Sequence, residues 1–433
     1  MNASSWQSFF NKIVSTFASN QPHKLTFTEL VLFGLSNIIG SGLFVALQSS
    51  LVYGGNMSIY ALLLMFISTI ITGYTYVELF ERYNSPITEY LSVKDSLGPM
   101  FGHIVAYLLY FFGILFFTTI IMYVTQYMWN LFAPSSIAHK FWGQPLLSTL
   151  LISIICFLLY EGIQNSRYIS YFISVLLIAV ILGVVFLSFP QYSYSSVFVK
   201  PPTPSVDNFI LSCIMSLFLF NGYDFIIKVK EETEKSEYTS KALILCMSLS
   251  ALAYFLIFIS CFSVLKYSGI SKINGDLVTR MYSVLENKKV SMVVYVISAV
   301  IMFNASLLTV MSSSRFLTEM GKQNEIPFKD FFEKPENAVI FTGLVGSIVT
   351  LIHSPTTVAI IANIMFILII LLMSTSLVII RWNERKNKSN QTKYNYLKWI
   401  NVDNIPLEVV MNIVLLIYIL YVIFRDRLWS CKK

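Results

Sequence analysis

The chain has 433 residues, of which 56% are hydrophobic and only 12% are charged. Soluble domains carry about twice that charged fraction, so this composition excludes an ordinary soluble domain. Apolar runs of about twenty residues, the length that crosses a bilayer as a helix, predict instead an all-α polytopic membrane protein. In a membrane protein the positions of the basic residues indicate its orientation, so the net charge of +7 does not indicate nucleic-acid binding.

Eleven membrane spans are predicted, at residues 25–51, 57–80, 101–130, 145–162, 168–189, 207–229, 240–265, 290–313, 337–353, 356–381 and 405–424. With the N-terminus inside, cytoplasmic segments hold 19 of the 30 Lys and Arg residues and outward segments hold 11. Because basic loops resist translocation, this asymmetry favours that orientation. The tail of residues 1–24 is then cytoplasmic, either as an amphipathic surface helix or as an apolar tail without structure.

The spans fall into two halves, separated by the Pro- and Ser-rich loop of residues 188–207. We expect one five-span repeat over residues 25–190 and a second over residues 205–382. Residues 383–433 are expected to add a cytoplasmic loop, one further span and a short tail. Each half opens with an interrupted apolar run, "SNIIGSG" in the first span and "FNGYD" in the sixth. Paired interruptions at matching positions point to the binding site of a secondary transporter.

The first interruption has a physical interpretation and an alternative. If the helix unwinds between Ser36 and Gly42, backbone amides and carbonyls become free inside the membrane, where only protein or a polar ligand can satisfy them. Free amides at a helix N-terminus suit a carboxylate and free carbonyls suit an ammonium, so together they match an α-amino acid. Alternatively, Ser36 and Gly40 form a small-xxx-small pair that only allows close helix packing.

Four motifs, in order, resemble the amino acid–polyamine–organocation (APC) permeases, which have the LeuT-type fold. They are "NIIGSGLFV" (37–45), "RYNSPITEYLSVKDSLGP" (82–99), "FLFNGYDFIIKVKEE" (218–232) and "FNASLLTVMSSSRFLTEMGKQNEIP" (303–327). The resemblance covers about residues 25–382. It implies inverted 5+5 repeats with broken first and sixth spans.

The resemblance also implies a set of substrate-binding positions, which are Ile38, Gly40, Ser41, Gly42, Phe218, Asn221 and Gly222. The amides of Gly40, Ser41 and Gly42 would hold the carboxylate of the substrate. The carbonyls of Ile38, Phe218 and Asn221 would take its amino group. Phe218 would be an aromatic gate, or else an ordinary core residue, and Gly222 would leave room for the substrate side chain.

Asp224 is the one carboxylate placed well inside a predicted span. Since ionising there is expensive, we expect a functional role for Asp224, and the resemblance to the APC permeases implies that this role is gating or proton sensing. The alternative is a neutral Asp bonded to a neighbouring span. Glu29, Glu78 and Glu81 lie at span ends, where solvation is easy, and receive no role. Polar residues of the eighth span, among them Asn304, Ser306, Thr309 and Ser312, either line the site or bond to other helices.

The resemblance predicts a secondary amino acid transporter, a permease or exchanger that works by alternating access in the plasma membrane or an organelle membrane. The alternative is an amino acid sensor or a transport-inactive degenerate permease. Some proton-coupled members of the family carry a lysine in the fifth span, whereas this fifth span has none. The resemblance therefore favours exchange or facilitated transport over that route of proton coupling, and coupling to protons or sodium stays open. Members of the family that pair with a glycoprotein heavy chain use a cysteine between spans three and four. Residues 130–145 contain no cysteine, so by the resemblance no disulfide-linked heavy chain is expected. The five cysteines and four histidines show no metal-ligand spacing, and with no catalytic dyad we expect neither cofactor nor enzyme activity.

Overall fold

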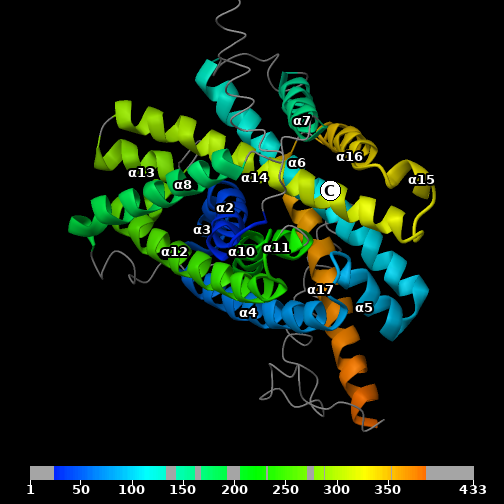
Figure 1. Cartoon of the computed structure of the whole chain (residues 1–433). Coiled ribbons are helices and arrows are strands. Elements are labelled where there is room, and N and C mark those ends of the chain that lie inside the picture. Colours follow the sequence, from blue (N-terminus) through cyan, green and yellow to red (C-terminus); the bar gives the residue numbers. More distant parts are fainter. Residues whose placement is uncertain are drawn as a thin grey trace, which may run out of the picture.

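The computed structural model describes residues 24–132, 143–160, 167–192, 205–230, 233–270, 277–286, 288–352 and 354–386. Within these ranges the chain is a bundle of helices without a β-strand, as Figure 1 shows. One isolated β-bridge joins Leu25 to Thr233. The predicted all-α class is therefore confirmed.

Helices match the first ten predicted spans closely. In chain order they are α2 (Phe27–Val45) with α3 (Leu47–Gly54), α4 (Ser58–Tyr83), α6 (Pro99–Phe132), α7 (Gln144–Tyr160), α8 (Arg167–Ser188), α10 (Val206–Leu219) with α11 (Asp224–Lys228), α12 (Ser236–Ile270), α14 (Lys288–Lys322), α16 (Pro335–Val349) and α17 (Pro355–Lys386). Shorter helices connect them: α5 (Thr88–Leu97), α13 (Leu277–Leu285), α15 (Lys329–Phe332) and the 3₁₀ turns Gly55–Met57 and Phe189–Gln191.

Eight candidate spans in the described part of the chain are long and apolar enough to cross a membrane. Helices α7 and α16 are apolar but shorter. The eleventh predicted span, residues 405–424, and the predicted surface helix in residues 1–24 lie outside the described residues. The total of eleven spans and the 5+5 repeat therefore stay predictions.

Local sequence signals fix where several helices begin and end. Thr26 and Glu29 form a capping box at the start of α2, in which the Glu29 carboxylate accepts a bond from the Thr26 amide at 2.9 Å. Asn84 adopts the left-handed conformation (φ 48°) and ends α4. Pro99, Pro335 and Pro355 each begin a helix, where the missing N–H of proline costs nothing.

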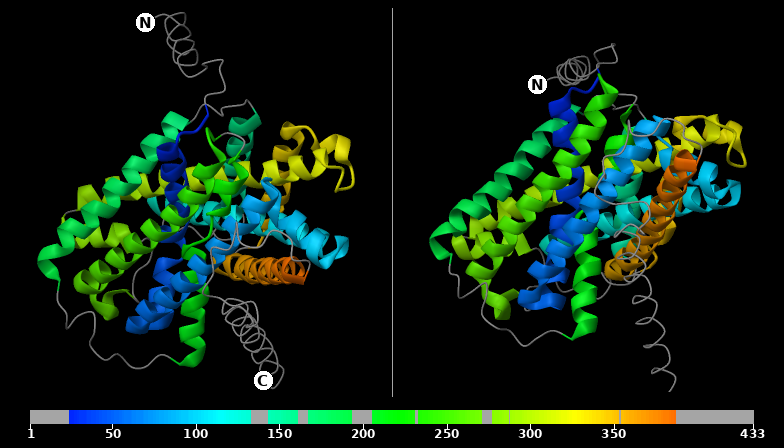
Figure 2. Two further views of the ribbon diagram at one scale, coloured as in Figure 1. Left: turned by 60° about the horizontal axis from the view of Figure 1, so that its bottom comes forward. Right: turned by 90° about the horizontal axis from the view of Figure 1, so that it is seen from below.

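The two interrupted spans lie at the centre of the bundle. Helix α2 packs against α8, α12, α14 and α10, and Figures 1 and 2 show it enclosed by these helices. The most apolar segment of α2 is 83% buried and that of residues 206–228 is 89% buried, against 39% for α8. Polar groups on these two spans can therefore be satisfied only by protein or by a bound ligand.

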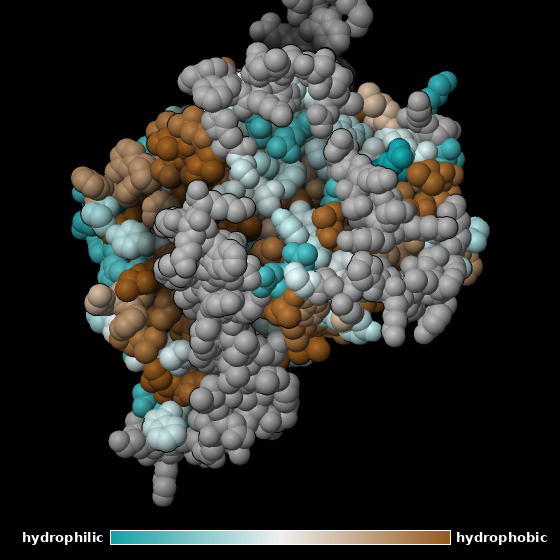
Figure 3. All heavy atoms as spheres, turned by 180° about the vertical axis from the view of Figure 1, so that it is seen from behind, coloured by the Kyte–Doolittle hydropathy of each residue, from teal (hydrophilic) through white to brown (hydrophobic). Residues whose placement is uncertain are grey.

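The outer face of the bundle is apolar. Large side chains such as Phe157, Phe172, Phe186 and Leu344 are each more than half exposed. On the coloured part of the face in Figure 3, brown side chains form several patches with pale and teal side chains between them. An exposed apolar belt of this kind is expected where helices face lipid rather than water.

Candidate functional site

The first interruption lies later in the chain than the sequence indicates. Helix α2 continues through Ser36 to Val45, and only Ala46, which keeps right-handed angles (φ −109°, ψ −25°), separates it from α3. The Ala46 amide still donates to the Gly42 carbonyl at 2.9 Å. The predicted unwinding between Ser36 and Gly42 is therefore wrong in this conformation, and the amides of Gly40, Ser41 and Gly42 lie inside a helix.

Small residues in α2 serve close packing and local hydrogen bonds instead of a break. A Cβ on Gly40 would lie 3.1 Å from Ile301 Cγ2 of α14, and Ser36, one turn earlier, accepts a bond from Asn304 of α14 at 3.4 Å. The Ser41 hydroxyl bonds to the Asn37 carbonyl within its own helix at 2.7 Å. The small-xxx-small alternative therefore describes the Ser36 and Gly40 face of α2.

The second interruption lies where the sequence predicts it. Helix α10 ends at Leu219, residues 220–223 form turns, and α11 begins at Asp224. Gly222 has φ +101°, a conformation that L side chains rarely adopt. The Gly222 carbonyl accepts a 2.8 Å bond from the Asn37 side-chain amide, so the broken sixth span bonds directly to the middle of the first.

Asn37 is the polar centre of this junction. Besides the bond to Gly222, its side-chain oxygen accepts a bond from the Thr309 hydroxyl of α14 at 3.3 Å. Asn304 and Thr309 of the eighth span thus both reach the first span, as expected for helix-to-helix bonding. The Ser306 hydroxyl, in contrast, bonds to Met302 of its own helix.

Tyr254 of α12 ties the two interrupted spans together. Its buried hydroxyl lies 3.0 Å from the Ile38 carbonyl and 2.7 Å from the Leu219 carbonyl. A hydroxyl has one proton to donate, so the two carbonyls share it. A Cβ on Gly42 would lie 2.4 Å from this hydroxyl and 2.6 Å from the Leu219 oxygen, so α2 and α10 are in backbone contact here.

Asn221 carries a buried acceptor that nothing in the described chain uses. Its side-chain amide donates to the Asn363 side-chain oxygen of α17 at 3.2 Å. Its side-chain oxygen has no hydrogen-bond partner, although the residue is fully buried. A buried unpaired acceptor costs about 1–3 kcal/mol, which makes this atom a natural place for a ligand donor.

Phe218 is also fully buried, with its ring centroid 4.8 Å from that of Phe116 on α6. The backbone carbonyl of Phe218 is predicted to accept a hydrogen bond from the substrate amino group. In the structure it already accepts one from the Asn221 backbone amide at 3.2 Å. Phe218 is a packed aromatic residue in this conformation, and its role as a gate stays a prediction.

Asp224 pairs with a residue that the sequence analysis did not use. The Lys228 ammonium lies 2.5 Å from the Asp224 carboxylate, one helical turn along α11. Both side chains are buried, and the ammonium also lies 5.8 Å from the centre of the Phe316 ring. Asp224 is therefore part of an ion pair, which differs from the alternative prediction of a neutral Asp bonded to a neighbouring span.

Two ionic clusters lie at the end of the bundle where α4 and α17 finish, which we call the inner end because the sequence predicts that it faces the cytoplasm. Glu78 of α4 is fully buried and binds Arg82 and Arg381, and Arg82 also binds Glu384 of α17. The expectation that Glu78 is solvated at a span end is wrong, because α17 covers it. In the second cluster, Glu325 binds Lys94 and Tyr90.

Sequence reasoning missed Asn37, Tyr254, Lys228 and Asn363 as site residues. Lys228 and Asn363 carried a signal, since each is a polar residue in an apolar run. Tyr254 has no such signal in the sequence, because a tyrosine in an apolar helix is usually an ordinary core residue.

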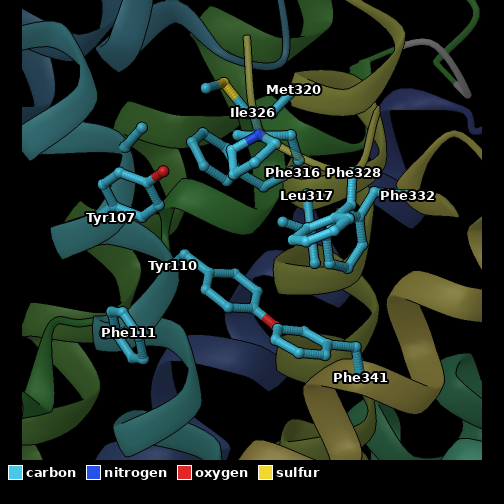
Figure 4. Close-up of a pocket in the computed structure, with 12 residues that line it drawn as sticks. Tyr107, Tyr110, Phe111, Phe316, Leu317, Met320, Ile326, Phe328, Phe332 and Phe341 are labelled. Atoms are coloured by element: carbon cyan, nitrogen blue, oxygen red, sulfur yellow. The ribbon is translucent and has the colours of Figure 1, made fainter. Parts of the chain in front are cut away.

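An apolar cavity of about 270 Å³ lies away from this junction (Figure 4). It lies among α6, α14 and the segment leading through α15 to α16, and it is lined by aliphatic and aromatic residues that include Tyr107, Tyr110, Phe316, Met320, Phe332 and Phe341. No predicted site residue lines it.

Within the described residues no group of His, Cys, Asp and Glu side chains could hold a metal ion. Cys156, Cys213, Cys246 and Cys261 are free thiols.

Together these features define a class of protein, a helical integral membrane protein whose buried polar groups gather where two interrupted spans meet. The chain belongs to the amino acid permease family, whose family model matches residues 25–425, and so to the APC superfamily. A comparison with curated proteins gave no match. The resemblance drawn from the four motifs is thus confirmed, and membership implies transport rather than enzyme catalysis.

Proposed function

We propose that this permease is a secondary transporter that moves amino acids across a membrane by alternating access, with the substrate at the junction of α2 and residues 220–223. The observation that carries the proposal is the fully buried, unpartnered side-chain oxygen of Asn221 beside the break in the sixth span. Family membership supports an amino acid as the substrate class. Inverted repeats over residues 25–190 and 205–382 would supply the two matching broken spans.

The ammonium group of the substrate finds two acceptors here. Asn221 offers its free side-chain oxygen. The Ile38 carbonyl accepts the shared Tyr254 proton in this structure, and a substrate ammonium with three donors would compete for it. Tyr254 thus occupies, in the absence of substrate, one of the two acceptors that the substrate uses, the Ile38 carbonyl.

The carboxylate group requires a change in α2. Because the amides of Gly40, Ser41 and Gly42 are inside the helix, they become donors for a ligand only if α2 opens at this point. The helix already ends one turn later, at Ala46. We propose that substrate binding extends this discontinuity toward Gly42, while Gly222 leaves room for the side chain and Phe218 covers the site.

Counterflow in proteoliposomes tests the function. The purified protein is reconstituted with a mixture of unlabelled amino acids inside, and single labelled amino acids are offered outside, with and without a pH or sodium gradient. Uptake that depends on internal amino acid and needs no gradient would identify the substrate and favour exchange. Uptake only under a gradient would identify the coupling ion.

The alternative function is an amino acid sensor or a degenerate permease. The same preparation distinguishes it, because equilibrium binding of a labelled amino acid can be measured in detergent. Binding without uptake under any gradient would favour the sensor, and neither binding nor uptake would favour the degenerate permease. The plasma membrane stays the expected location.

A further inference from the structure

Glu89 is a buried carboxyl group without a partner. It is the second residue of α5, in the connection between α4 and α6, and its exposed fraction is 0%. Neither of its carboxyl oxygens has a hydrogen-bond partner in another residue. Among the carboxyl groups of the described chain it alone is buried and unsatisfied, whereas Glu78, Asp224 and Glu325 bind cations.

The charges that act on Glu89 come from α11. Lys228 favours the ionised form of Glu89 and Asp224 opposes it. Because Lys228 and Asp224 already form an ion pair at 2.5 Å, they offer Glu89 little net positive charge. An ionised Glu89 would leave this buried group with an uncompensated negative charge, whereas a protonated Glu89 leaves it neutral.

Charged groups on the other elements around α5 are engaged elsewhere. Helix α5 packs against α4, α6 and α17. On α4 and α17, Arg82 and Arg381 bind Glu78 and Glu384. Lys94 of α5 itself binds Glu325, and His103 of α6 lies 4.0 Å from the same carboxylate. None of these ion pairs includes Glu89.

Resting on the transport function proposed above, we propose that Glu89 is a proton-binding site of this permease, protonated while the inner end is closed around it and ionised when that end opens to water. The geometry supplies the coupling, since α5 packs with α6 and α17 whereas Lys228 and Asp224 belong to the broken sixth span. A movement of α11 relative to α5 would change the charges that act on Glu89, and water admitted to Glu89 at the same time would remove the penalty for its charge.

The pH range follows from the burial. Burial raises the pKa of Glu89 from 4.5 to about 7, with Lys228 opposing the rise and Asp224 adding to it. Because this pKa is raised, burial favours the protonated form. The closed inner end is therefore fully stabilised below the ordinary pKa of glutamate, and it loses that contribution as the pH rises through about 7.

The site itself can be tested without transport. The full-length protein is reconstituted, and the infrared band of protonated carboxyl groups is followed from about pH 5 to about pH 9. We expect a band that titrates near neutral pH in the wild type and is absent in Glu89→Gln. Persistence of that band in Glu89→Gln would overturn the proposal. In Asp224→Asn, Lys228 keeps its charge without a partner, so the midpoint of the Glu89 titration should shift to lower pH. An unchanged midpoint would contradict the proposed coupling of Glu89 to α11. This second variant keeps the test decisive even if Glu89→Gln fails to fold.

Its role in transport is tested by counterflow with Glu89→Gln and a control, Glu81→Gln, whose carboxyl is only partly buried near the end of α4. Wild type and Glu81→Gln should lose severalfold in rate between about pH 6 and about pH 8. Glu89→Gln, which is always neutral, should keep its rate at both pH values and gain nothing from an imposed proton gradient. The same pH dependence in Glu89→Gln would contradict coupling through Glu89. If no protein transported any amino acid, the proposed function would fail while the infrared titration still decided the proton site.

Discussion

At Gly42 the backbones of the two interrupted spans are in direct contact. A Cβ there would meet the Leu219 carbonyl oxygen at 2.6 Å and the Leu219 Cα at 2.8 Å. Both are backbone atoms that cannot rotate away, so any side chain must push α10 from α2. The residue therefore fixes the distance between the halves of the candidate site.

Gly42→Leu is expected to abolish amino acid binding and to lower stability by about 3 kcal/mol or more, because its side chain has no space between the backbones. Isothermal binding and thermal unfolding in detergent would measure both effects. Gly102→Leu is a control on α6, where a Cβ would meet Lys94 rather than the site. Unimpaired binding by Gly42→Leu would refute the proposed site.

Tyr254→Phe should separate stability from affinity. Removing the hydroxyl deprives the buried Ile38 and Leu219 carbonyls of a donor, which should cost about 1–2 kcal/mol of stability. If substrate ammonium competes for the Ile38 carbonyl, the same change should lower the Kd of the substrate. Tyr282→Phe is the matched control, since its hydroxyl donates to the Val180 carbonyl at 3.0 Å away from the site. A raised Kd in Tyr254→Phe would show that the hydroxyl helps to bind substrate.

At the scale of the elements, the turn of residues 220–223 depends on Gly222. Gly222→Ala should lower the stability of the protein by about 1–3 kcal/mol, because alanine is strained at φ +101°. The rate of counterflow should fall severalfold, because the added Cβ would lie 2.9 Å from Asn37 Nδ2. Gly98→Ala is a close control, with φ +97° and nothing within 4 Å of the added Cβ. Equal losses of counterflow in the two variants would point to backbone strain alone.

Helices α4 and α17 are joined by a buried ion pair. Glu78→Gln leaves Arg381 and Arg82 without their shared carboxylate, and breaking a buried pair costs about 3–5 kcal/mol. Glu237→Gln is a suitable control, because Glu237 pairs with Lys241 on the exposed surface and such pairs contribute about 0–1 kcal/mol. Thermal unfolding of the two variants should differ accordingly. A Glu78→Gln protein as stable as Glu237→Gln would show that water reaches the pair.

The sequence was sufficient to predict the helices and one of the two interruptions. Long apolar runs mark the spans, and "FNGYD" breaks a run with residues that have no packing use in the middle of a helix. "SNIIGSG" misled because glycine and serine inside an apolar helix serve close packing as well as unwinding, and only the position of α14 decides between them. The burial of Glu78 and Glu89 could not be predicted, because it depends on which distant helices cover the ends of α4 and α5.

On the scale of the whole molecule, the buried or paired carboxylates described above lie toward one end of the bundle. Glu89, the Asp224–Lys228 pair, the Glu78–Arg381 pair and the Glu325–Lys94 pair all lie at or near the inner end. The Glu78–Arg381 and Glu325–Lys94 pairs each join segments far apart in the sequence, whereas Asp224 and Lys228 pair within α11. Opening that end must break or hydrate several of them, so pH and salt should act on the inner end before they act on the buried junction.

The sequence predicts the orientation of the molecule in the membrane, with its inner end in the cytoplasm, and cysteine labelling tests this prediction. Phe328, 81% exposed, follows α14, and Phe189, 70% exposed, follows α8 at the opposite end of the bundle. In a Cys431→Ser background, the thiols of the described spans are buried or partly buried, so a single new cysteine dominates labelling by a membrane-impermeant maleimide. Phe189→Cys should react in intact cells, and Phe328→Cys only after permeabilisation, because the sequence predicts that 19 of the 30 basic residues lie on the side of Phe328. The reverse pattern would place Glu89 and the ionic clusters outside, and protons would then reach Glu89 from the external medium.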